Sequence, residues 1–244
     1  MPEITHQVSS SINALMREFE TITHNLANVS TAGYKRRCTA FSKSLEAQSN
    51  RARTNAGEGI DLNSALDFAQ GNVTETGRPL DLALHGKGFF LIETPEGPLY
   101  TRNGVFQTNP NGQIVDSEGR LVAGEAGPIT IPRGAALSQL SVSSDGSISV
   151  GGTAVGRFKL VDFKSNERRL ISAGTNCFRM PDKDIKPVTA EKVAVKQGYQ
   201  EASNVRIIDE LVDMIMVSRL YEANMQLISA KKQTATSIVS VAMG

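Results

Sequence analysis

Hydrophobic positions near the start of the chain recur with the period of an α-helix. Between residues 8 and 29 the apolar side chains are spaced alternately four and three residues apart, the rhythm of helices that pack along a stripe. No glycine or proline, the residues that break helices, interrupts residues 3–32. The pattern therefore predicts a helix over residues 4–30. The stripe consists of Val8, Ile12, Leu15, Phe19, Ile22, Leu26 and Val29.

A second apolar stripe runs along the last part of the chain. Residues 204–243 contain neither glycine nor proline, which predicts a helix roughly 60 Å long at about 1.5 Å per residue. Ser203 and Asn204 are residue types preferred at a helix N-cap, and Asp209 and Glu210 would follow near the positive end of the helix dipole. The stripe, which shifts phase once after Ile215, consists of Val205, Ile208, Val212, Ile215, Leu220, Ala223, Leu227 and Ala230.

The middle of the chain has the pattern of short strands separated by turns. Residues 71–198 hold 17 of the 21 glycines and 8 of the 9 prolines. Residues 89–92 form a wholly apolar run, as expected of a buried strand, and Asn103-Gly104 and Asn111-Gly112 are strong tight-turn signals. Frequent turns without an intervening helical pattern predict an antiparallel β domain.

The patterns together predict an α+β protein, in which long N- and C-terminal helices pair as a coiled-coil-like bundle and flank an antiparallel β-rich middle domain. The N-terminal helix alone is marginal in water and needs a partner. The C-terminal helix is too long to be covered by it, which leaves surface for other copies of the chain. Two amphipathic helices lying on the protein's own core are the alternative. The expected domains are residues 1–34, 35–66, 67–200 and 201–244.

The second of these domains, residues 35–66, is predicted to be a basic extended linker. It is either a solvated connection or a segment that orders only against neighbouring subunits, and both interpretations stay open. Its basic side chains up to residue 53 are Lys35, Arg36, Arg37, Lys43, Arg51 and Arg53, against the single acidic Glu46.

The charge balance narrows the range of partners. With 26 basic and 25 acidic side chains the net charge is +1, which argues against a nucleic-acid partner and suits a protein that associates with itself. No apolar segment is long enough to span a membrane, so we expect no direct membrane insertion, and no ordinary signal peptide is visible. Cys38 and Cys177 fit no metal or redox spacing; they permit a disulfide without indicating one.

Residues that could carry catalysis do not form a recognisable set. The histidines show no metal-ligand spacing, and Gly86-Lys87-Gly88 precedes a strand instead of opening a helix as a nucleotide-binding turn would. The acidic cluster of Asp209, Glu210 and Asp213 is most simply a solvated helix face. The acidic residues Asp81, Glu93, Asp116 and Asp162 show no sign of burial or pairing in the sequence. We therefore expect no catalytic, cofactor or metal site and no enzyme activity.

The end of the first helical stripe carries a motif. Residues 25–35, Asn-Leu-Ala-Asn-Val-Ser-Thr-Ala-Gly-Tyr-Lys, closely resemble the N-terminal motif of the flagellar axial proteins, which comprise rod, hook and hook–filament junction subunits. The chain departs from that pattern at Ala32, where the family most often has proline. The motif residues carried over are Asn25, Leu26, Ala27, Asn28, Ser30, Thr31, Gly33 and Tyr34.

Further matches follow in the order that the family shows. Residues 78–84, 86–90 and 100–104 resemble the start of its β domain, and the likeness is weakest at 39–66 and 164–197. The residues that resemble its C-terminal helix include Ser203, Asn204, Val205, Arg219, Tyr221 and Glu222. Within the family, residues 124–132 and 156–161 look more like the proximal than the distal rod subunits, and distal subunits usually have a longer stretch in place of residues 39–66.

The resemblance implies a structural subunit of the basal-body rod, which polymerises through its terminal helices into the periplasmic drive shaft. The partners it implies are other copies of the chain, other rod subunits, the type III export apparatus and, as further candidates, the surrounding ring proteins. It also implies export without a cleaved signal peptide. Two other classes stay open from the residues alone: a cytoplasmic helical oligomerisation or binding module, and a secreted enzyme acting on cell-wall glycan.

Overall fold

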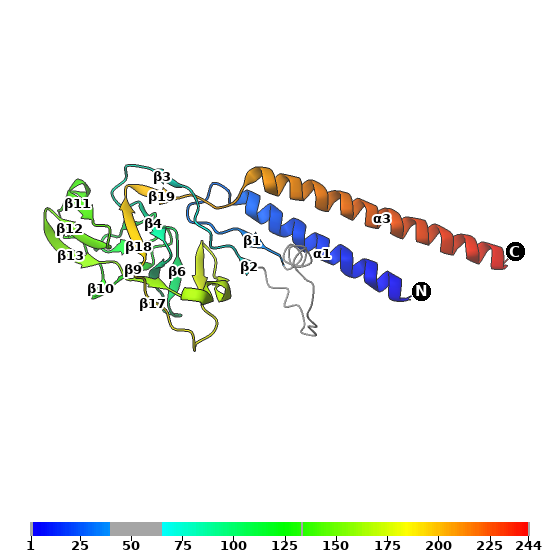
Figure 1. Cartoon of the computed structure of the whole chain (residues 1–244), viewed down its shortest axis with the longest axis horizontal. Coiled ribbons are helices and arrows are strands. Elements are labelled where there is room, and N and C mark those ends of the chain that lie inside the picture. Colours follow the sequence, from blue (N-terminus) through cyan, green and yellow to red (C-terminus); the bar gives the residue numbers. More distant parts are fainter. Residues whose placement is uncertain (1, 40–64, 133, 244) are drawn as a thin grey trace. The chain divides into compact units, whose positions relative to one another are not determined.

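The computed structural model describes residues 2–39, 65–132 and 134–243, and the side chains from residue 10 to residue 234 within those ranges. Most of the expected basic linker, residues 40–64, lies outside the described residues. The chain divides into two compact units, a helical unit and a β unit (Figure 1). The helical unit comprises Met1–Ala27, Arg37–Ala65 and Arg206–Gly244, and the β unit comprises Asn28–Arg36 and Leu66–Val205.

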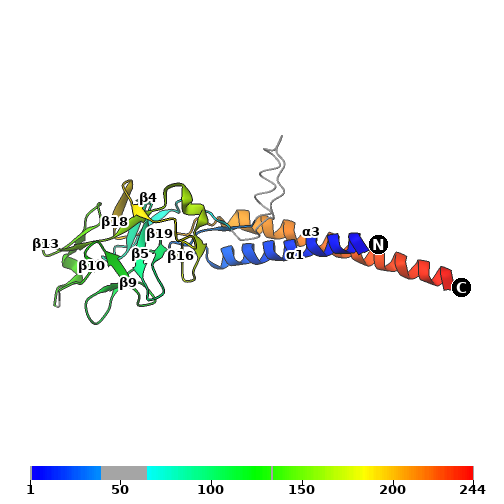
Figure 2. The ribbon, with the colours of Figure 1, turned by 90° about the horizontal axis from the view of Figure 1, so that it is seen from below.

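The helical unit contains helices α1 (Pro2–Ala27) and α3 (Ile207–Met243). The two helices run side by side over part of their length in both views (Figures 1 and 2). Their shared apolar cluster is small: it consists of buried Leu15, Ile22 and Val217, with half-buried Leu26 and Met214 packed against it. A buried polar contact accompanies it, since Asn25 Nδ2 lies 3.2 Å from Glu210 Oε2.

The expectation that the terminal helices pair as a coiled-coil-like bundle is wrong. The described chain has one helix at each end, and they meet through only a few apolar side chains. The predicted stripe of α3 does not face α1; Ile208 is 76% exposed and Ile215 is 55% exposed. Apolar residues occur on all sides of α3, so their spacing alone does not select a face. The face that packs carries Glu210, Met214 and Val217 instead.

The bounds of both helices differ from those predicted. Helix α1 ends at Ala27, and the chain then turns, with the Thr31 N–H donating to the Asn28 carbonyl at 3.1 Å. Helix α3 begins at Ile207, beyond the expected N-cap. The Asn204 side chain does not cap the helix, because its oxygen accepts the Arg36 N–H at 2.7 Å.

The β unit consists of short strands, and all of its pairings within the described residues are antiparallel, as the turn pattern predicted. Strand β1 (Arg37–Cys38) belongs to the helical unit, and β2 (Ala65–Leu66) contains the last residue of one unit's segment and the first of the next. The strands that lie wholly in the β unit are β3 (Val73–Glu75), β4 (Leu82–Gly86), β5 (Phe89–Glu93), β6 (Leu99–Thr101), β7 (Gln107–Thr108), β8 (Ile114–Val115), β9 (Leu121–Gly124), β10 (Gly127–Pro128), β11 (Leu140–Val142), β12 (Ser147–Val150), β13 (Thr153–Arg157), β14 (Leu160–Asp162), β15 (Ile171–Ser172), β16 (Cys177–Arg179), β17 (Val188–Thr189), β18 (Val193–Gln197) and β19 (Tyr199–Glu201). Two 3₁₀ helices, η1 (Leu137–Gln139) and η2 (Lys164–Arg169), lie between them.

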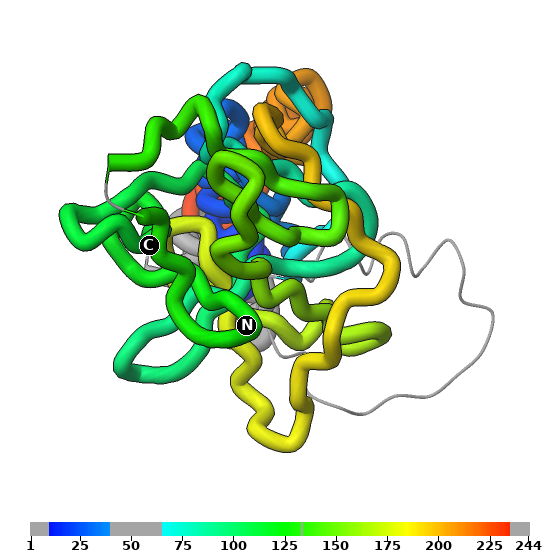
Figure 3. The backbone as a smooth tube through the Cα atoms, turned by 90° about the vertical axis from the view of Figure 1, so that its left-hand side faces the viewer, coloured from blue at the N-terminus to red at the C-terminus, as the bar shows by residue number. Residues whose placement is uncertain are grey.

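One large sheet organises this unit, with the strand order β15-β16-β6-β5-β9-β8-β7. In addition, β14 pairs with β5, β17 pairs with β14, and β10 pairs with β9. Strands β11, β12 and β13 form a separate sheet, and β4 pairs with β18. The last strand, β19, pairs with β3, the first strand that lies wholly in the unit, so that early and late parts of the chain lie together (Figure 3).

Strand β5 is covered on both faces, which explains its uninterrupted apolar run. Phe90 and Ile92 belong to one buried cluster, whereas Phe89 and Leu91 belong to another. Because successive side chains of a strand point to opposite faces, both faces of the sheet must be buried at this strand. The sheet therefore has a core on each side, and the second core borders the site described next.

Candidate functional site

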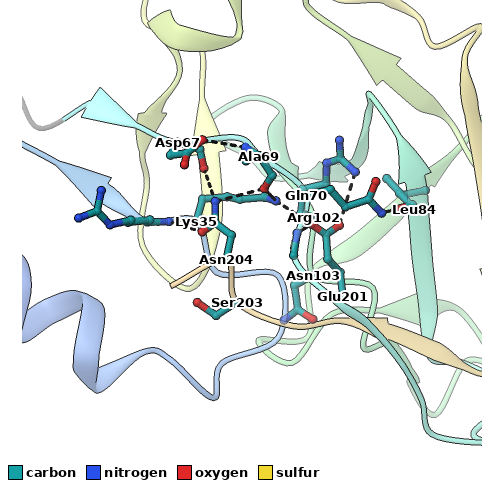
Figure 4. A network of polar contacts seen from close by, with 12 residues as sticks. Lys35, Asp67, Ala69, Gln70, Leu84, Arg102, Asn103, Glu201, Ser203 and Asn204 are labelled. Carbon is teal, nitrogen blue, oxygen red and sulfur yellow. Dashed lines mark hydrogen bonds and ion pairs between the residues drawn. The ribbon is translucent and has the colours of Figure 1, made fainter. Parts of the chain in front are cut away.

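Three buried charged side chains meet within the β unit and form what we call the ion network: Lys35, Arg102 and Glu201. Lys35 Nζ lies 2.6 Å from Glu201 Oε1, and both side chains are 0% exposed. Arg102 Nη1 lies 3.5 Å from Glu201 Oε2. One carboxylate thus lies between two cations that come from segment 28–36 and from the end of β6 (Figure 4). Such a network gains stability from each of its remaining polar atoms that finds a partner.

Backbone carbonyls and an aromatic ring complete the surroundings of the two cations. Lys35 Nζ donates to the Ala69 carbonyl at 2.7 Å, and Arg102 Nη2 donates to the Gly86 carbonyl at 2.7 Å. The guanidinium carbon of Arg102 lies 5.4 Å from the centre of the Phe89 ring, within cation–π range. Arg102 Nε has no hydrogen-bond partner in the part of the chain that the structure describes.

Burial and pairing act in opposite directions on these cations. Burial lowers the pKa of the Lys35 ammonium, and the nearby Glu201 carboxylate opposes that effect. Burial likewise lowers the pKa of the Arg102 guanidinium, again opposed by Glu201. Glu201 is therefore the main negative charge that favours the ionised form of both buried cations, and Asp67 adds to it at Lys35 while Glu167 and Asp162 add to it at Arg102.

Two glycines allow the backbone to approach the network closely. Gly33 has φ +69°, and a Cβ placed there would lie 2.4 Å from the Asn103 nitrogen. A Cβ at Gly71 would lie 2.0 Å from the Ala202 carbonyl oxygen. Gly71 also donates its N–H to Glu201 Oε1 at 3.1 Å, while Gly33 donates to the Glu201 main-chain oxygen at 2.7 Å. A side chain at either position would push segments of the site apart.

Asn204 connects three stretches of chain next to the ion network. Its Oδ1 accepts the Arg36 N–H, and its Nδ2 donates to the carbonyls of Asp67 and Ala69 at 2.9 and 3.1 Å. The Arg36 carbonyl in turn accepts the Asp67 N–H at 2.9 Å. The end of the N-terminal motif and the start of the C-terminal motif, far apart in sequence, are therefore held together at this site.

The residues carried over from the family motif fall into three places. Gly33, Tyr34, Ser203, Asn204 and Val205 lie in the β unit around the ion network, and Asn28, Ser30 and Thr31 form the turn that precedes it. Asn25, Leu26 and Ala27 end α1, where the Asn25 side chain bonds the main chain of Arg37. Arg219, Tyr221 and Glu222 lie on an exposed part of α3.

The expected assembly residues also separate. Leu15 and Ile22 are buried in the helical unit, Ile12 and Leu26 are half-buried, and Phe19 is exposed; Val8 is in α1, but its side chain lies outside the described residues. Val29, half-buried, and Val205, buried, belong to the β unit. The exposed members on α3 are Ile208, Val212, Ile215, Leu220 and Leu227.

The sequence did not single out Glu201, Arg102 or Asp67 as site residues. Lys35 was recognised only as the last position of a motif and as part of a basic linker. A usable signal was the position of Glu201, the carboxylate nearest to Ser203 and Asn204 in the chain. Glu201 pairs with Lys35, which lies 166 positions away in the sequence, and with Arg102, which lies 99 positions away, and spacing cannot predict contacts over such separations.

Two of the four carboxylates for which the sequence gave no sign of burial or pairing are in fact buried and paired. Asp81 is 1% exposed, with Oδ1 3.0 Å from Arg78, and Asp116 pairs with Arg120 at 2.6 Å. These are ion pairs with arginine, and among the described residues no three His, Cys, Asp or Glu side chains are grouped as metal ligands. Within the same residues, no helix is long and apolar enough to cross a membrane.

The structure is thus an α+β chain with a helix at each end of the described residues, exposed apolar residues on α3 and a buried ion network that joins distant backbone segments. Two family models match it. The flagellar hook protein FlgE/F/G D1 domain matches residues 83–150, and the flagellar basal body rod FlgEFG protein C-terminal region matches residues 196–241.

Curated relatives match most of the chain. The flagellar basal-body rod protein FlgG of Buchnera aphidicola subsp. Acyrthosiphon pisum is 32% identical, over 92% of this chain and 94% of that protein. The FlgF proteins of Mesorhizobium japonicum and Caulobacter vibrioides are 32% and 34% identical, over 97% and 92% of this chain and 95% and 91% of those proteins. The chain belongs to the flagellar basal-body rod protein family. This membership confirms the expectation that it is a structural protein and not an enzyme.

Proposed function

We propose that this chain is a subunit of the flagellar basal-body rod and that it polymerises through the apolar surface of its terminal helices. Family membership supports the structural role in the rod. Contacts between unlike surfaces of identical subunits, if they do not close into a ring, generate a helical polymer. The helical unit offers a surface suited to such contacts.

The observation that carries this proposal is the exposed apolar face of α3. Ile208, Ile215 and Leu227 are 76%, 55% and 54% exposed in the single chain. Large contiguous apolar surfaces on a soluble chain mark sites of association, because covering them removes apolar area from water. Helix α3 has 37 residues against 26 in α1, so one chain does not provide enough helix to cover it.

Within the rod we favour the proximal position, with the distal position as the second candidate. The two segments that resemble proximal subunits, residues 124–132 and 156–161, are in contact in the β unit. Gly124 and Phe158 form a β-bridge, and the Glu125 N–H donates to the Arg157 carbonyl at 3.0 Å. The two segments that carry the resemblance thus form one local feature.

The partners follow from this position. Other copies of the chain and other rod subunits would bind the helical unit, and the ring proteins around the rod are candidates for contacts outside it. A periplasmic rod subunit must leave the cytoplasm, and we propose passage through the flagellar export apparatus without cleavage of a signal peptide. N-terminal sequencing of the chain from isolated basal bodies tests the last point, since cleavage would remove its first residues.

Leu227→Asp tests assembly through α3. The β unit should stay folded, because Leu227 is exposed and lies in the other unit, whereas a charge on the covered face should stop polymerisation. Circular dichroism of the purified chain and complementation of a deletion strain measure the two effects. Gln226→Asp, a substitution at a neighbouring exposed position, is the control, and a strain that carries it should swim normally. Wild-type motility of the Leu227→Asp strain would count against the proposal.

Electron cryotomography of the deletion strain separates the two rod positions. A proximal subunit is needed before the rest of the rod can be added, so its loss should remove the rod from near the inner membrane outward, together with the hook. A rod stub that lacks only its outer part would support the distal position. Cells with complete rods and hooks would refute a required role.

A further inference from the structure

A single residue of β19 contacts the segment that follows α1 at two points. The main-chain oxygen of Glu201 accepts the Gly33 N–H at 2.7 Å, and its Oε1 accepts a hydrogen bond from Lys35 Nζ at 2.6 Å. In the sequence, β19 directly precedes the stretch that leads to α3. Glu201 therefore joins, within the β unit, the chain segments that continue into both helices.

Strand β19 and segment 28–36 differ in the contacts with the β unit that each would keep if the other were absent. Strand β19 pairs with β3 at three positions, and the Ala202 N–H donates to the Asn72 carbonyl at 2.7 Å. The Glu201 carboxylate would also keep Arg102 and the Gly71 N–H as partners. The C-terminal stretch thus has attachments to the β unit that do not involve segment 28–36.

Segment 28–36 lacks an equivalent support for its charge. Its other bonds to the β unit include those of Arg36 with Asp67 and Asn204 and that of Ala32 with Asn176. Lys35 Nζ is fully buried, and without Glu201 its remaining contact in the described structure is the Ala69 carbonyl. A buried ammonium without a carboxylate is strongly unfavourable, and the segment can avoid that state by leaving the site.

We propose that Glu201 makes the docking of segment 28–36 on the β unit conditional on β19, so that the two chain ends are ordered there together. Since coupling between two binding events is reciprocal, docked Lys35 also stabilises β19 in place. This coupling goes beyond the proposed function in the rod, because the isolated subunit would show it without assembling.

Hydrogen exchange of the full-length chain near neutral pH tests the coupling, read at the Gly33 and Arg36 amides. Glu201→Gln should lower protection across segment 28–36 by at least about tenfold and leave β5 unchanged. Glu75→Gln is the matched control, since Glu75 lies on the paired strand with an exposed side chain, and it should change neither region. Unchanged protection of segment 28–36 in Glu201→Gln would overturn the proposal.

A double-mutant cycle separates charge coupling from a general loosening of the site. In a Lys35→Met background no buried cation of segment 28–36 depends on Glu201, although Arg102 of the β unit still does. Glu201→Gln should therefore change protection of segment 28–36 by less than about threefold. Equal losses in both backgrounds would overturn the proposal. If Glu201→Gln unfolds the β unit, seen as lost protection in β5, Glu201→Asp replaces it in the same cycle with the same expected pattern, because it keeps the charge and withdraws it from Lys35.

Discussion

At Gly33 the chain passes against the backbone of Arg102 and Asn103 with φ +69°, a combination that excludes any side chain. The sequence identified Gly33 only as a residue of the family motif that lies at the end of the predicted first helix, and α1 has already ended at Ala27. The role of Gly33 is therefore to bring segment 28–36 close to the ion network. A motif can fix the residue type required at a position while leaving its contacts undetermined.

Gly33→Ala should be strongly destabilising for the β unit. Its Cβ would lie 2.4 Å from a backbone nitrogen, so the clash adds to the cost of a left-handed conformation, together roughly 3 kcal/mol of unfolding free energy. Gly77→Ala is the control, because φ is +70° there and nothing lies within 4 Å, so about 1 kcal/mol is expected. Urea denaturation followed by circular dichroism measures both, and equal losses would contradict the argument.

Glu167 provides a pH-dependent prediction. Burial raises the pKa of this carboxyl, and Asp162 adds to the rise while Lys87 and Arg102 oppose it. A raised folded-state pKa means that ionised Glu167 lowers the free energy of unfolding. The loss is complete at pH values above the folded-state pKa and absent at pH values below the usual pKa near 4.5.

Glu167→Gln should therefore raise the melting temperature at pH 7, and the gain should disappear as the pH falls below about 4.5, the ordinary glutamate pKa. Thermal melts across this range measure the effect. Glu118→Gln, at an exposed position, is the comparison that allows for the loss of one negative charge. A gain at pH 4 as large as that at pH 7 would contradict a pKa origin.

At the scale of elements, α3 shows why an apolar pattern did not predict packing. Its apolar residues occupy every side, and the predicted stripe is exposed while Val217 and Met214 meet α1. The face that packs against α1 also carries Glu210, whose side chain accepts a hydrogen bond from Asn25; the two residues are 0% and 1% exposed. The spacing on α1 was a better guide, since Leu15 and Ile22 of its stripe are buried.

Ile22→Ala should reduce the stability of the isolated subunit, whereas Ile208→Ala should reduce polymerisation. Ile22 is 2% exposed between the helices, so its truncation should cost about 2–4 kcal/mol and loosen α1 in the isolated subunit. Ile208 is 76% exposed, so its truncation should leave the subunit's helicity unchanged and weaken polymerisation only. Hydrogen exchange of α1 and sedimentation of assembled rods read out the two effects; a loss of α1 protection in Ile208→Ala would contradict the assignment of faces.

At the scale of the whole molecule, the β unit includes the stretch that follows α1 and the stretch that precedes α3. Residues 28–34 and 201–205 lie in it, although the sequence pattern grouped them with the terminal helices, and so do Lys35 and Arg36, which were expected in the linker. The hydrogen bonds of Glu201 and Asn204 account for this difference, because they attach one stretch to the β unit just after α1 ends and the other just before α3 begins.

The sequence by itself determined the α+β class, the antiparallel strands and the motifs of the rod family, because glycine and proline positions, turn dipeptides and local motifs depend on short stretches of chain. Only the tertiary structure decided which face of α3 packs, where the helices end and which carboxylate holds Lys35. Those outcomes depend on contacts between residues more than 100 positions apart, such as Lys35 and Glu201, and on burial, which converts ordinary charged residues into an ion network.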